Sequence, residues 1–377
     1  MKNKRIVIVA NSTWNIYKFR LNIIKRLIEF DNEVIVIAPL DEYISYKESF
    51  PKVKHISLKN LSRNYTHPFS DVKAIFELRA IYKRLKPDIV IHYTHKANIY
   101  GGFAALLSKT TSVAVVTGLG YAFLHKGFIN FITRVLYKLV RPAHKKIIFE
   151  NDDDMALFIT KKLVKADQAT YVNGCGVDTA VYLPIAEPKE KKEKIIFTFI
   201  GRLLYDKGIL EFVAAAEQLT KNNKHLEFWV IGELDEENPS MVEKSKFLQW
   251  IDQDYIKYHG FIDDVRPYIA QSNCVVLPSY REGMPRIILE ALSMAKPVIT
   301  TDTAGCRQTV EHGKNGYLVK ARDIEDLVGG INKFLKLSPE EQELMGVNGR
   351  EMAIKNFNSE KISMELYEIV SQVYFCT

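Results

Sequence analysis

The hydrophobic residues of this 377-residue chain form short runs, separated by segments of helical periodicity. In the first half, apolar runs typical of buried strands alternate with stretches in which apolar residues recur every three to four positions. We expect strands at 5–10, 33–39, 54–58, 88–93, 113–117, 146–150 and 169–173, and helices at 17–30, 69–85, 96–108 and 128–141. Strands that alternate with helices predict a parallel sheet covered on both faces.

The same pattern restarts after residues 184–194, a polar segment without apolar period that predicts an interdomain linker. Strands are expected at 195–200, 226–231, 257–259, 274–277 and 298–300, and helices at 207–219, 323–335 and 339–356. The sequence therefore predicts an α/β protein with two doubly wound, Rossmann-like domains, residues 1–183 and 195–359. A last helix, about 360–377, is expected to return to the first domain. Tandem domains of this kind place a ligand cleft between them, at the carboxyl ends of the strands.

Composition and charge limit the classes of protein, the compartment and the partners that fit this sequence. The chain is 47% hydrophobic and 26% charged, as in a soluble globular protein, and its first apolar run is too short for a signal peptide. Its four cysteines are scattered, which predicts a reduced cytoplasmic compartment without structural zinc. Residues 1–186 carry a net charge of +13 and residues 187–377 one of −6. A basic first half indicates an anionic partner, either a membrane surface or a nucleic acid; no nucleic-acid-binding module accompanies the charge, so we expect no nucleic acid partner.

The stretch from Ser279 to Glu290 follows an expected strand and opens an expected helix. Gly283 allows close approach of a ligand, and Pro285 suits the first turn of the helix. A helix N-terminus at such a loop favours an anionic group such as a diphosphate. Glu282 and Glu290, with seven residues between them, are acceptors suited to sugar or ribose hydroxyls, although two glutamates at this spacing also occur on solvated helices.

This Glu-x7-Glu pattern resembles the signature of the retaining glycosyltransferases of family 4, which have the GT-B fold. A second match follows the strand at 195–200, where Gly201-Arg202-Leu203-Leu204-Tyr205-Asp206-Lys207-Gly208 resembles the family's Arg-x4-Lys-Gly motif. The resemblance assigns the donor diphosphate to Arg202 and Lys207, and catalytic roles to these two residues and Glu282. It places the UDP-sugar donor against Gly283, Met284, Pro285, Glu290, Gly232 and Phe261. The alternative is a strand-turn-helix with ordinary charged loop residues.

The first domain carries a Thr117-Gly118-Leu119-Gly120-Tyr121 loop. It resembles a subgroup that adds sugars to polyprenyl-diphosphate-linked acceptors, including N-acetylgalactosaminyltransferases of bacterial N-glycan assembly and relatives in capsule and O-antigen clusters. The resemblance implies acceptor contacts at Asn11, Ser12, Thr117, Gly118, Gly120 and Tyr121. Many family members carry a histidine near Thr117, which this chain lacks. His95 is a candidate substitute on the catalytic side, or a structural hydrogen-bonding residue.

We expect no metal and no cofactor besides the donor. The acidic runs Asp152–Asp154 and Asp252–Asp254 suit a helix start and a polar connection, respectively. The pair His92-x-x-His95 has ligand-like spacing only in a helix, and here it ends an expected strand. The resemblance implies that the leaving phosphate itself accepts the proton of the acceptor hydroxyl, so that no protein base is required.

The expected activity is therefore transfer of a hexose or N-acetylhexosamine, with N-acetylgalactosamine as best guess, from a UDP-sugar to a polyprenyl-diphosphate-linked sugar. The alternatives are a UDP-sugar 2-epimerase of the same fold and a transferase that acts on a soluble acceptor. The segment 128–141 has an apolar face, with Arg134, Lys138 and Arg141 on another face. It predicts either an interfacial helix on an anionic membrane or a core helix with a solvated basic side. The first interpretation places the protein peripherally on the cytoplasmic face of the inner membrane.

Overall fold

The computed structural model describes residues 1–61, 68–124, 127–185, 194–221, 223–236 and 238–375, without the side chains of residues 68, 69, 121 and 122. The chain divides into two compact units. Unit 1 comprises Met1–Cys175 and Ser359–Thr377, and unit 2 comprises Gly176–Asn358. Most of the expected linker, residues 186–193, lies outside the described residues.

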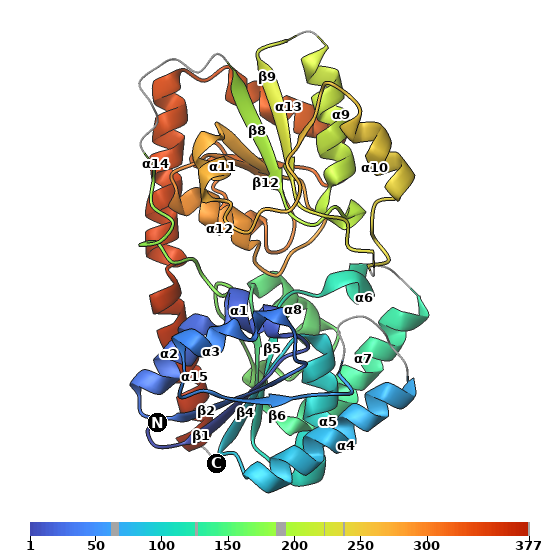
Figure 1. Ribbon diagram of the computed structural model, residues 1–377, viewed down its shortest axis with the longest axis vertical. Coiled ribbons are helices and arrows are strands. Elements are labelled where there is room, and N and C mark those ends of the chain that lie inside the picture. Colours follow the sequence, from blue (N-terminus) through green and yellow to red (C-terminus); the bar gives the residue numbers. More distant parts are fainter. Residues whose placement is uncertain (62–67, 125–126, 186–193, 222, 237, 376–377) are drawn as a thin grey trace. The chain divides into compact units, whose positions relative to one another are not determined.

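Unit 1 contains a seven-stranded parallel sheet in the order β3-β2-β1-β4-β5-β6-β7 (Figure 1). The strands are β1 Arg5–Val9, β2 Glu33–Ala38, β3 Lys54–Ser57, β4 Ile89–Tyr93, β5 Ser112–Val116, β6 His144–Phe149 and β7 Ala169–Tyr171. The helices are α1 Thr13–Phe19, α2 Leu21–Glu29, α3 Tyr46–Ser49, α4 Pro68–Leu85, α5 Gly102–Ser108, α6 Gly120–Leu124, α7 Phe128–Val140, α8 Asp152–Thr160 and α15 Ser359–Phe375. A π-helical turn, Ala97–Gly101, precedes α5.

Both faces of this sheet are covered, which explains the uninterrupted apolar strands. Alternate residues of β1 face opposite layers: Ile6 and Ile8 contact one core cluster, and Val7 and Val9 contact another. The first cluster includes residues of α2 and of α15, and α15 lies beside α2 (Figure 1). The last helix of the chain is therefore part of unit 1.

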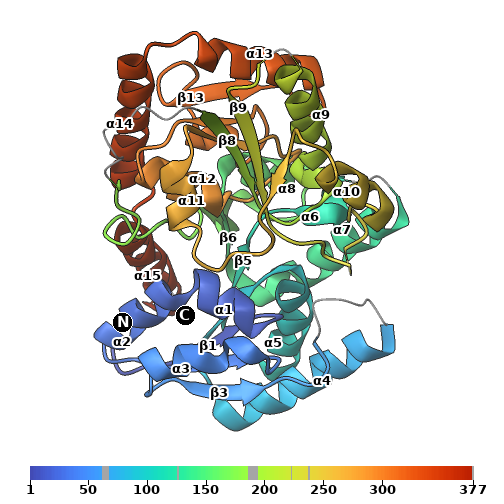
Figure 2. The same ribbon diagram turned by 45° about the horizontal axis from the view of Figure 1, so that its top comes forward.

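Unit 2 contains a six-stranded parallel sheet in the order β10-β9-β8-β11-β12-β13 (Figures 1 and 2). The strands are β8 Ile195–Ile200, β9 Leu226–Ile231, β10 Lys257–Tyr258, β11 Cys274–Leu277, β12 Val298–Thr301 and β13 Gly316–Val319. The helices are α9 Ile209–Thr220, α10 Lys244–Ile251, α11 Arg266–Gln271, α12 Arg286–Ser293, α13 Ile324–Leu335 and α14 Pro339–Asn356. The prediction of two doubly wound parallel sheets is confirmed.

Some details differ from the sequence-based expectation. The strand β13, Gly316–Val319, was not expected. The helix expected at 17–30 is two helices, because Arg20 leaves helical geometry at φ −119° and ψ 1° between α1 and α2. The first unit ends at Cys175 rather than at residue 183. The segment that follows belongs to unit 2, since Val177 forms a β-bridge with Asn358 and the carbonyl of Tyr182 accepts hydrogen bonds from Ser293 and Arg350.

Candidate active site

The sheet of unit 2 reverses its direction of winding between β8 and β11. The chain proceeds from β8 through β9 to β10 toward one edge, and from β11 through β12 to β13 toward the other. In open parallel sheets, ligands bind outside the carboxyl ends of the strands at such a switch point. Arg202 and Lys207 lie in the loop after β8, and Glu282 lies in the loop after β11. The fold therefore brings these three expected residues to the same end of two adjacent strands.

The two loops contact each other through their backbones. The carbonyl of Asp206 accepts hydrogen bonds from the Tyr280 amide at 2.9 Å and from Ser279 Oγ at 3.0 Å. Gly208 adopts φ +75°, and a Cβ atom at this position would lie 2.0 Å from the carbonyl oxygen of Pro278. Only glycine combines this left-handed conformation with so close an approach. The relative position of the loops is therefore fixed by backbone contacts.

Lys207 and Glu282 form an ion pair at this junction, with 2.5 Å between Lys207 Nζ and Glu282 Oε1. Ser279 Oγ donates a hydrogen bond to the same carboxylate oxygen at 2.7 Å. The Lys207 and Glu282 side chains are 23% and 12% exposed, so both can still meet a ligand. A single ammonium is a phosphate donor and a single carboxylate is an acceptor for hydroxyl groups, so the pair suits a sugar phosphate.

The backbone around Glu282 is also held tightly. Its amide donates to the carbonyl of Ala304 at 3.0 Å. Gly305 has φ +80°, and a Cβ atom there would lie 2.4 Å from the carbonyl oxygen of Glu282. Thr301 Oγ1, at the end of β12, donates to the carbonyl of Ser279. Three neighbouring strand ends thus position the glutamate loop.

Arg202 extends from the end of β8 with 41% of its side chain exposed. Its Nη1 lies 2.5 Å from Asp235 Oδ2, in the loop after β9. A guanidinium has five N–H donors, so this contact leaves capacity for the oxygens of a diphosphate. Sequence reasoning did not identify Asp235, because its partner is 33 positions away and no local pattern connects the two.

The helix α12 begins one residue later than expected. Pro285 is its N-cap, with ψ 102°, and not a residue of its first turn. The Pro285 carbonyl accepts hydrogen bonds from the amides of Ile288 and Leu289. An extended residue in this position is the ordinary start of a helix, so the amide end of α12 still follows the Gly283 loop.

Glu290 lies on α12 and is 7% exposed. Arg286 Nε donates to Glu290 Oε1 at 2.8 Å, which orients the carboxylate along the helix. Burial raises the pKa of Tyr182, and the charge of Glu290 raises it further, so this hydroxyl is close to the pair and stays protonated. The spacing of four residues between Arg286 and Glu290 could have predicted this ion pair from the sequence.

The other expected donor residues occupy different environments. Gly232 has φ +144°, its amide donates to the carbonyl of Gly260, and a Cβ atom there would lie 1.9 Å from the Gly201 carbonyl oxygen. Phe261 is 53% exposed in the loop after β10. The Met284 side chain is buried in an apolar cluster of unit 2, so only its backbone is placed to contact a donor.

The expected acceptor residues lie in loops at the carboxyl edge of the sheet of unit 1. Asn11 and Ser12 follow β1, and Ser12 caps α1 by accepting from the Asn15 amide at 3.2 Å. Thr117 and Gly118 follow β5, and Gly120 begins α6 with φ +57°. The side chain of Tyr121 lies outside the described residues. Since β1, β4 and β5 are neighbours, these loops share one end of the sheet.

His95 is held by aromatic side chains. Its Nδ1 lies 2.7 Å from the hydroxyl oxygen of Tyr137, and its ring stacks on Phe123 at 5.9 Å. Burial lowers the pKa of His95, against the effect of hydrogen bonds to the backbone of Gly118 and Leu119, so the ring is neutral near pH 7. These contacts fit the structural interpretation of this histidine.

The residues whose spacing resembles that of metal ligands do not come together in one group. His92 contacts the Tyr82 hydroxyl at 2.9 Å, whereas His95 contacts Tyr137, so the two histidines serve different partners. Asp152–Asp154 form the first turn of α8, whose N-cap Asn151 accepts from the Asp154 amide at 2.8 Å. Among the described residues, no three His, Cys, Asp or Glu side chains form a group that could hold a metal ion.

Known proteins show the same two-part organisation. Residues 5–151 match the family model described as Glycosyl transferase 4-like, and residues 185–352 match that of Glycosyl transferases group 1. The N,N'-diacetylbacillosaminyl-diphospho-undecaprenol alpha-1,3-N-acetylgalactosaminyltransferase of Campylobacter jejuni is 30% identical over 351 residues, with 88% of this chain and 89% of the relative covered. The UDP-Gal:alpha-D-GlcNAc-diphosphoundecaprenol alpha-1,3-galactosyltransferase of Escherichia coli is 25% identical, with 85% and 83% covered.

Among solved structures, the sucrose-phosphate synthase of Thermosynechococcus elongatus superposes with a TM-score of 0.82 at 18% identity, and 100% of each chain is covered. This likeness establishes the GT-B fold. The chain belongs to the glycosyltransferases, with a Glycosyl transferase 4-like first part and a group 1 second part.

Proposed function

We propose that this glycosyltransferase moves a hexose or N-acetylhexosamine, with N-acetylgalactosamine as the best guess, from a UDP-sugar to a sugar on a polyprenyl diphosphate. The observation that carries the proposal is the Lys207–Glu282 pair at the switch point of unit 2, with Arg202 on the same strand end. The two relatives support the substrate class, because their names specify diphosphoundecaprenol-linked acceptors and, in one case, a UDP-sugar. The product would enter a bacterial surface polysaccharide or glycan.

The proposed reaction retains the anomeric configuration by front-face displacement. The bond from the sugar C1 to the diphosphate oxygen breaks, the acceptor hydroxyl oxygen bonds to C1, and its proton passes to the leaving diphosphate. Arg202, Lys207 and the amide end of α12 stabilise the charge on that diphosphate. Glu282 orients the sugar ring, and Glu290 accepts hydrogen bonds from the ribose hydroxyls.

A membrane-docking face would bring the enzyme to its lipid-linked acceptor. Helix α7 is anchored in unit 1 by the buried Tyr137 and Val140. Its other face exposes six large apolar side chains, between 38% and 76% exposed: Phe128, Ile129, Phe131, Ile132, Val135 and Leu139. Exposed apolar residues continue on α4 and α5, which contact each other, and α5 contacts α7 (Figures 1 and 2). The alternative of a core-facing helix therefore does not hold for this face.

Basic side chains border the apolar face of α7. Lys138 and Lys145 are exposed, and Arg134 and Arg141 are partly exposed. Apolar side chains beside a basic rim suit an anionic lipid surface, where each basic residue contributes on the order of 1 kcal/mol. No helix in the described part of the chain is long and apolar enough to cross a bilayer. We therefore propose reversible peripheral association with the cytoplasmic face of the membrane.

Co-sedimentation with anionic and neutral vesicles at several salt concentrations tests this association. We expect binding to anionic vesicles that weakens with salt, and its loss when Arg134, Lys138 and Arg141 are changed together to Glu. A matched control changes three exposed lysines of unit 2, Lys221, Lys224 and Lys244, to Glu. Equal binding of both triple variants, or no binding by the wild type at low salt, would contradict the proposed docking face.

The substrate class is tested by incubating the protein with a panel of UDP-sugars, with and without a polyprenyl-diphosphate-linked monosaccharide. We expect UDP release and sugar incorporation into the lipid only when both substrates are present. Interconversion of a UDP-sugar in the absence of acceptor would instead support the alternative 2-epimerase. Transfer to free sugars but not to the lipid-linked sugar would support a soluble acceptor.

A further inference from the structure

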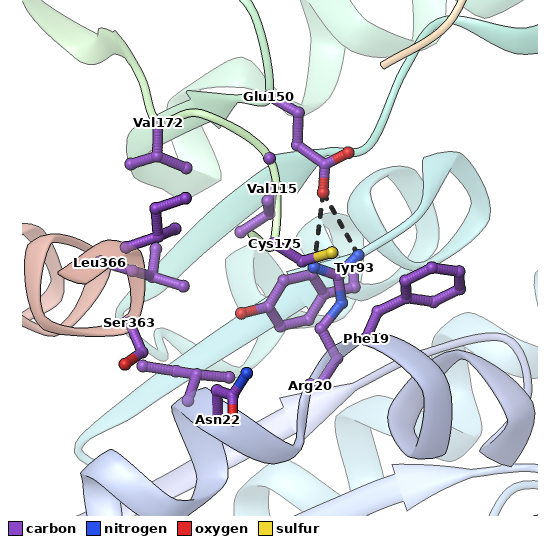
Figure 3. A pocket seen from close by; sticks show the side chains of 13 residues that line it. Phe19, Arg20, Asn22, Tyr93, Val115, Glu150, Val172, Cys175, Ser363 and Leu366 are labelled. Atoms are coloured by element: carbon purple, nitrogen blue, oxygen red, sulfur yellow. Dashed lines mark hydrogen bonds and ion pairs between the residues drawn. The ribbon is translucent and has the colours of Figure 1, made fainter. Parts of the chain in front are cut away.

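A buried ion pair lies at the carboxyl edge of the sheet of unit 1, between two residues that the sequence did not assign to the acceptor. Arg20 Nη1 and Nη2 each lie 3.4 Å from Glu150 Oε1, and the two side chains are 5% and 8% exposed. The guanidinium carbon is 4.2 Å from the centre of the Tyr93 ring. These residues line a small pocket together with Cys175 and residues of α2 and α15 (Figure 3).

The pair is poorly suited to stabilising the fold. Both guanidinium contacts converge on one carboxylate oxygen, and 3.4 Å is long for a charge-assisted hydrogen bond. Desolvation of two charges offsets the attraction of a buried pair, so an apolar pair of similar size is often no less stable. Burial raises the pKa of Glu150, and the opposing effect of Arg20 is smaller. A role other than stability therefore accounts better for the pair.

Its connections extend to three loops of the acceptor side. Arg20 Nε donates to Asn15 Oδ1 at 3.3 Å, and the Asn15 amide donates to Ser12 Oγ. Tyr93, under the guanidinium, is the last residue of β4 and directly precedes Thr94, a non-glycine residue at φ +76°. Glu150 directly follows β6. The strand order β1-β4-β5-β6 places the Thr117–Gly120 loop after β5 between the ends of β4 and β6.

We propose that Arg20 and Glu150 are positioning residues for the acceptor. They hold the loop after β1 and the ends of β4 and β6 in one arrangement, and so set the position of Ser12, His95 and the loop after β5. This explains why α1 and α2 are separate helices, since Arg20 leaves helical geometry at the point where its side chain reaches Glu150. The role in acceptor binding rests on the proposed function, whereas the ordering of the loops does not.

The pocket has a further property that fits a positioning role of the Arg20–Glu150 pair, which we call the clamp, rather than a close-packed core. The Tyr93 hydroxyl is fully buried and has no hydrogen-bond partner among the described residues. Burial raises its pKa to about 12, so it remains a neutral donor. An unsatisfied buried hydroxyl costs stability. This part of unit 1 therefore holds both a desolvated ion pair and an unsatisfied polar group next to the strand ends.

The test compares the wild type with Glu150→Gln, with the apolar double variant Arg20→Met/Glu150→Leu and with Glu33→Gln. The last is a matched control, because Glu33 pairs with Arg5 at the opposite, amino-terminal end of the same sheet. For both clamp variants we expect a rise of tenfold or more in KM for the lipid-linked acceptor, with KM for the UDP-sugar and the Kd of UDP unchanged. Glu33→Gln should leave all three constants unchanged.

Hydrogen exchange provides a readout that needs no substrate. In the clamp variants, amides of residues 11–16, 94–98 and 117–120 should exchange at least tenfold faster than in the wild type, and those of unit 2 should not change. Unchanged exchange in these segments with unchanged acceptor KM, or equal losses in donor and acceptor constants, would overturn the proposal. Faster exchange in a protein that uses no lipid-linked acceptor would instead refute the proposed substrate and retain the loop positioning.

Discussion

Replacing Lys207 by Met tests the switch-point site most sharply. The substitution keeps the length of the side chain and removes its charge. Its first consequence is for Glu282, which loses the ammonium at 2.5 Å and keeps the hydrogen bond from Ser279 Oγ at 2.7 Å. Its second consequence is for the donor, because the diphosphate would lose one of the two cationic side chains proposed to bind it, Lys207 and Arg202.

The two consequences have different magnitudes. A hydrogen bond to a charged group contributes about 1.5–3 kcal/mol, and the Glu282 side chain is only 12% exposed, so we expect about 2 kcal/mol of lost stability. For a unit of this size, that loss lowers the melting temperature by about 4–8 °C. Removal of one preorganised group that stabilises transition-state charge lowers kcat by about 10²–10³.

The assays are UDP release under saturating acceptor, calorimetric titration with UDP, and thermal unfolding. The matched control is Lys221→Met, since Lys221 pairs with Glu217 on the surface of α9 in the same unit, with side chains 66% and 49% exposed. An exposed pair contributes little, so the control should retain activity and melt within about 1 °C of the wild type. A folded Lys207→Met variant with kcat/KM and UDP affinity within twofold of the wild type would refute the reasoning.

Three further outcomes are expected. Gly305→Ala should destabilise the protein by more than Gly313→Ala. Both glycines have φ +80°, but a Cβ atom at Gly305 would lie 2.4 Å from a backbone oxygen, whereas nothing lies within 4 Å of a Cβ atom at Gly313. Denaturant unfolding should show a difference of about 2 kcal/mol between the two variants, and equal losses of stability would contradict the close approach. Burial lowers the pKa of His144 to about 4. Because the unfolded chain binds the proton more strongly, the stabilisation is fully present above pH 6.5, and the free energy of unfolding falls by about 3 kcal/mol as the pH decreases to about 4. A His144→Gln variant with an unchanged slope of unfolding free energy against pH would exclude this residue as the cause. Transfer should persist in excess EDTA, and loss that magnesium or manganese reverses would contradict the metal-independent mechanism.

Among the described residues, the sequence predicted the strands of the first sheet and all strands of the second except β13, because parallel strands buried on two faces are continuous apolar runs. The sequence did not predict the break at Arg20, whose side chain contacts a carboxylate 130 positions away. Likewise, periodicity identified the apolar face of α7 but could not show whether another element covers it. Whether a face is covered depends on the packing of the other helices, which a single amphipathic segment does not encode.

Part of the site could also be predicted from the sequence. Arg202, Lys207 and Glu282 lie next to strand ends, where a linear motif fixes their place in the fold. Asp235, the partner of Arg202, comes from another loop, after β9, and the loop of Ser279 meets the loop after β8 at the Asp206 carbonyl. The ion pair between Arg286 and Glu290 could have been predicted, because Arg286 lies four residues before Glu290 on one helix.

The anomeric configuration of the product tests the central claim most directly. The protein is incubated with UDP-N-acetylgalactosamine, whose sugar is α-linked, and a polyprenyl-diphosphate-linked monosaccharide, and the new linkage on the lipid is analysed by NMR. Retaining transfer at the Lys207–Glu282 site predicts a disaccharide with an α-linkage, formed about 10²–10³ times more slowly when Lys207 is replaced by Met. A β-linked product, or product formation by that variant at the wild-type rate, would contradict the account.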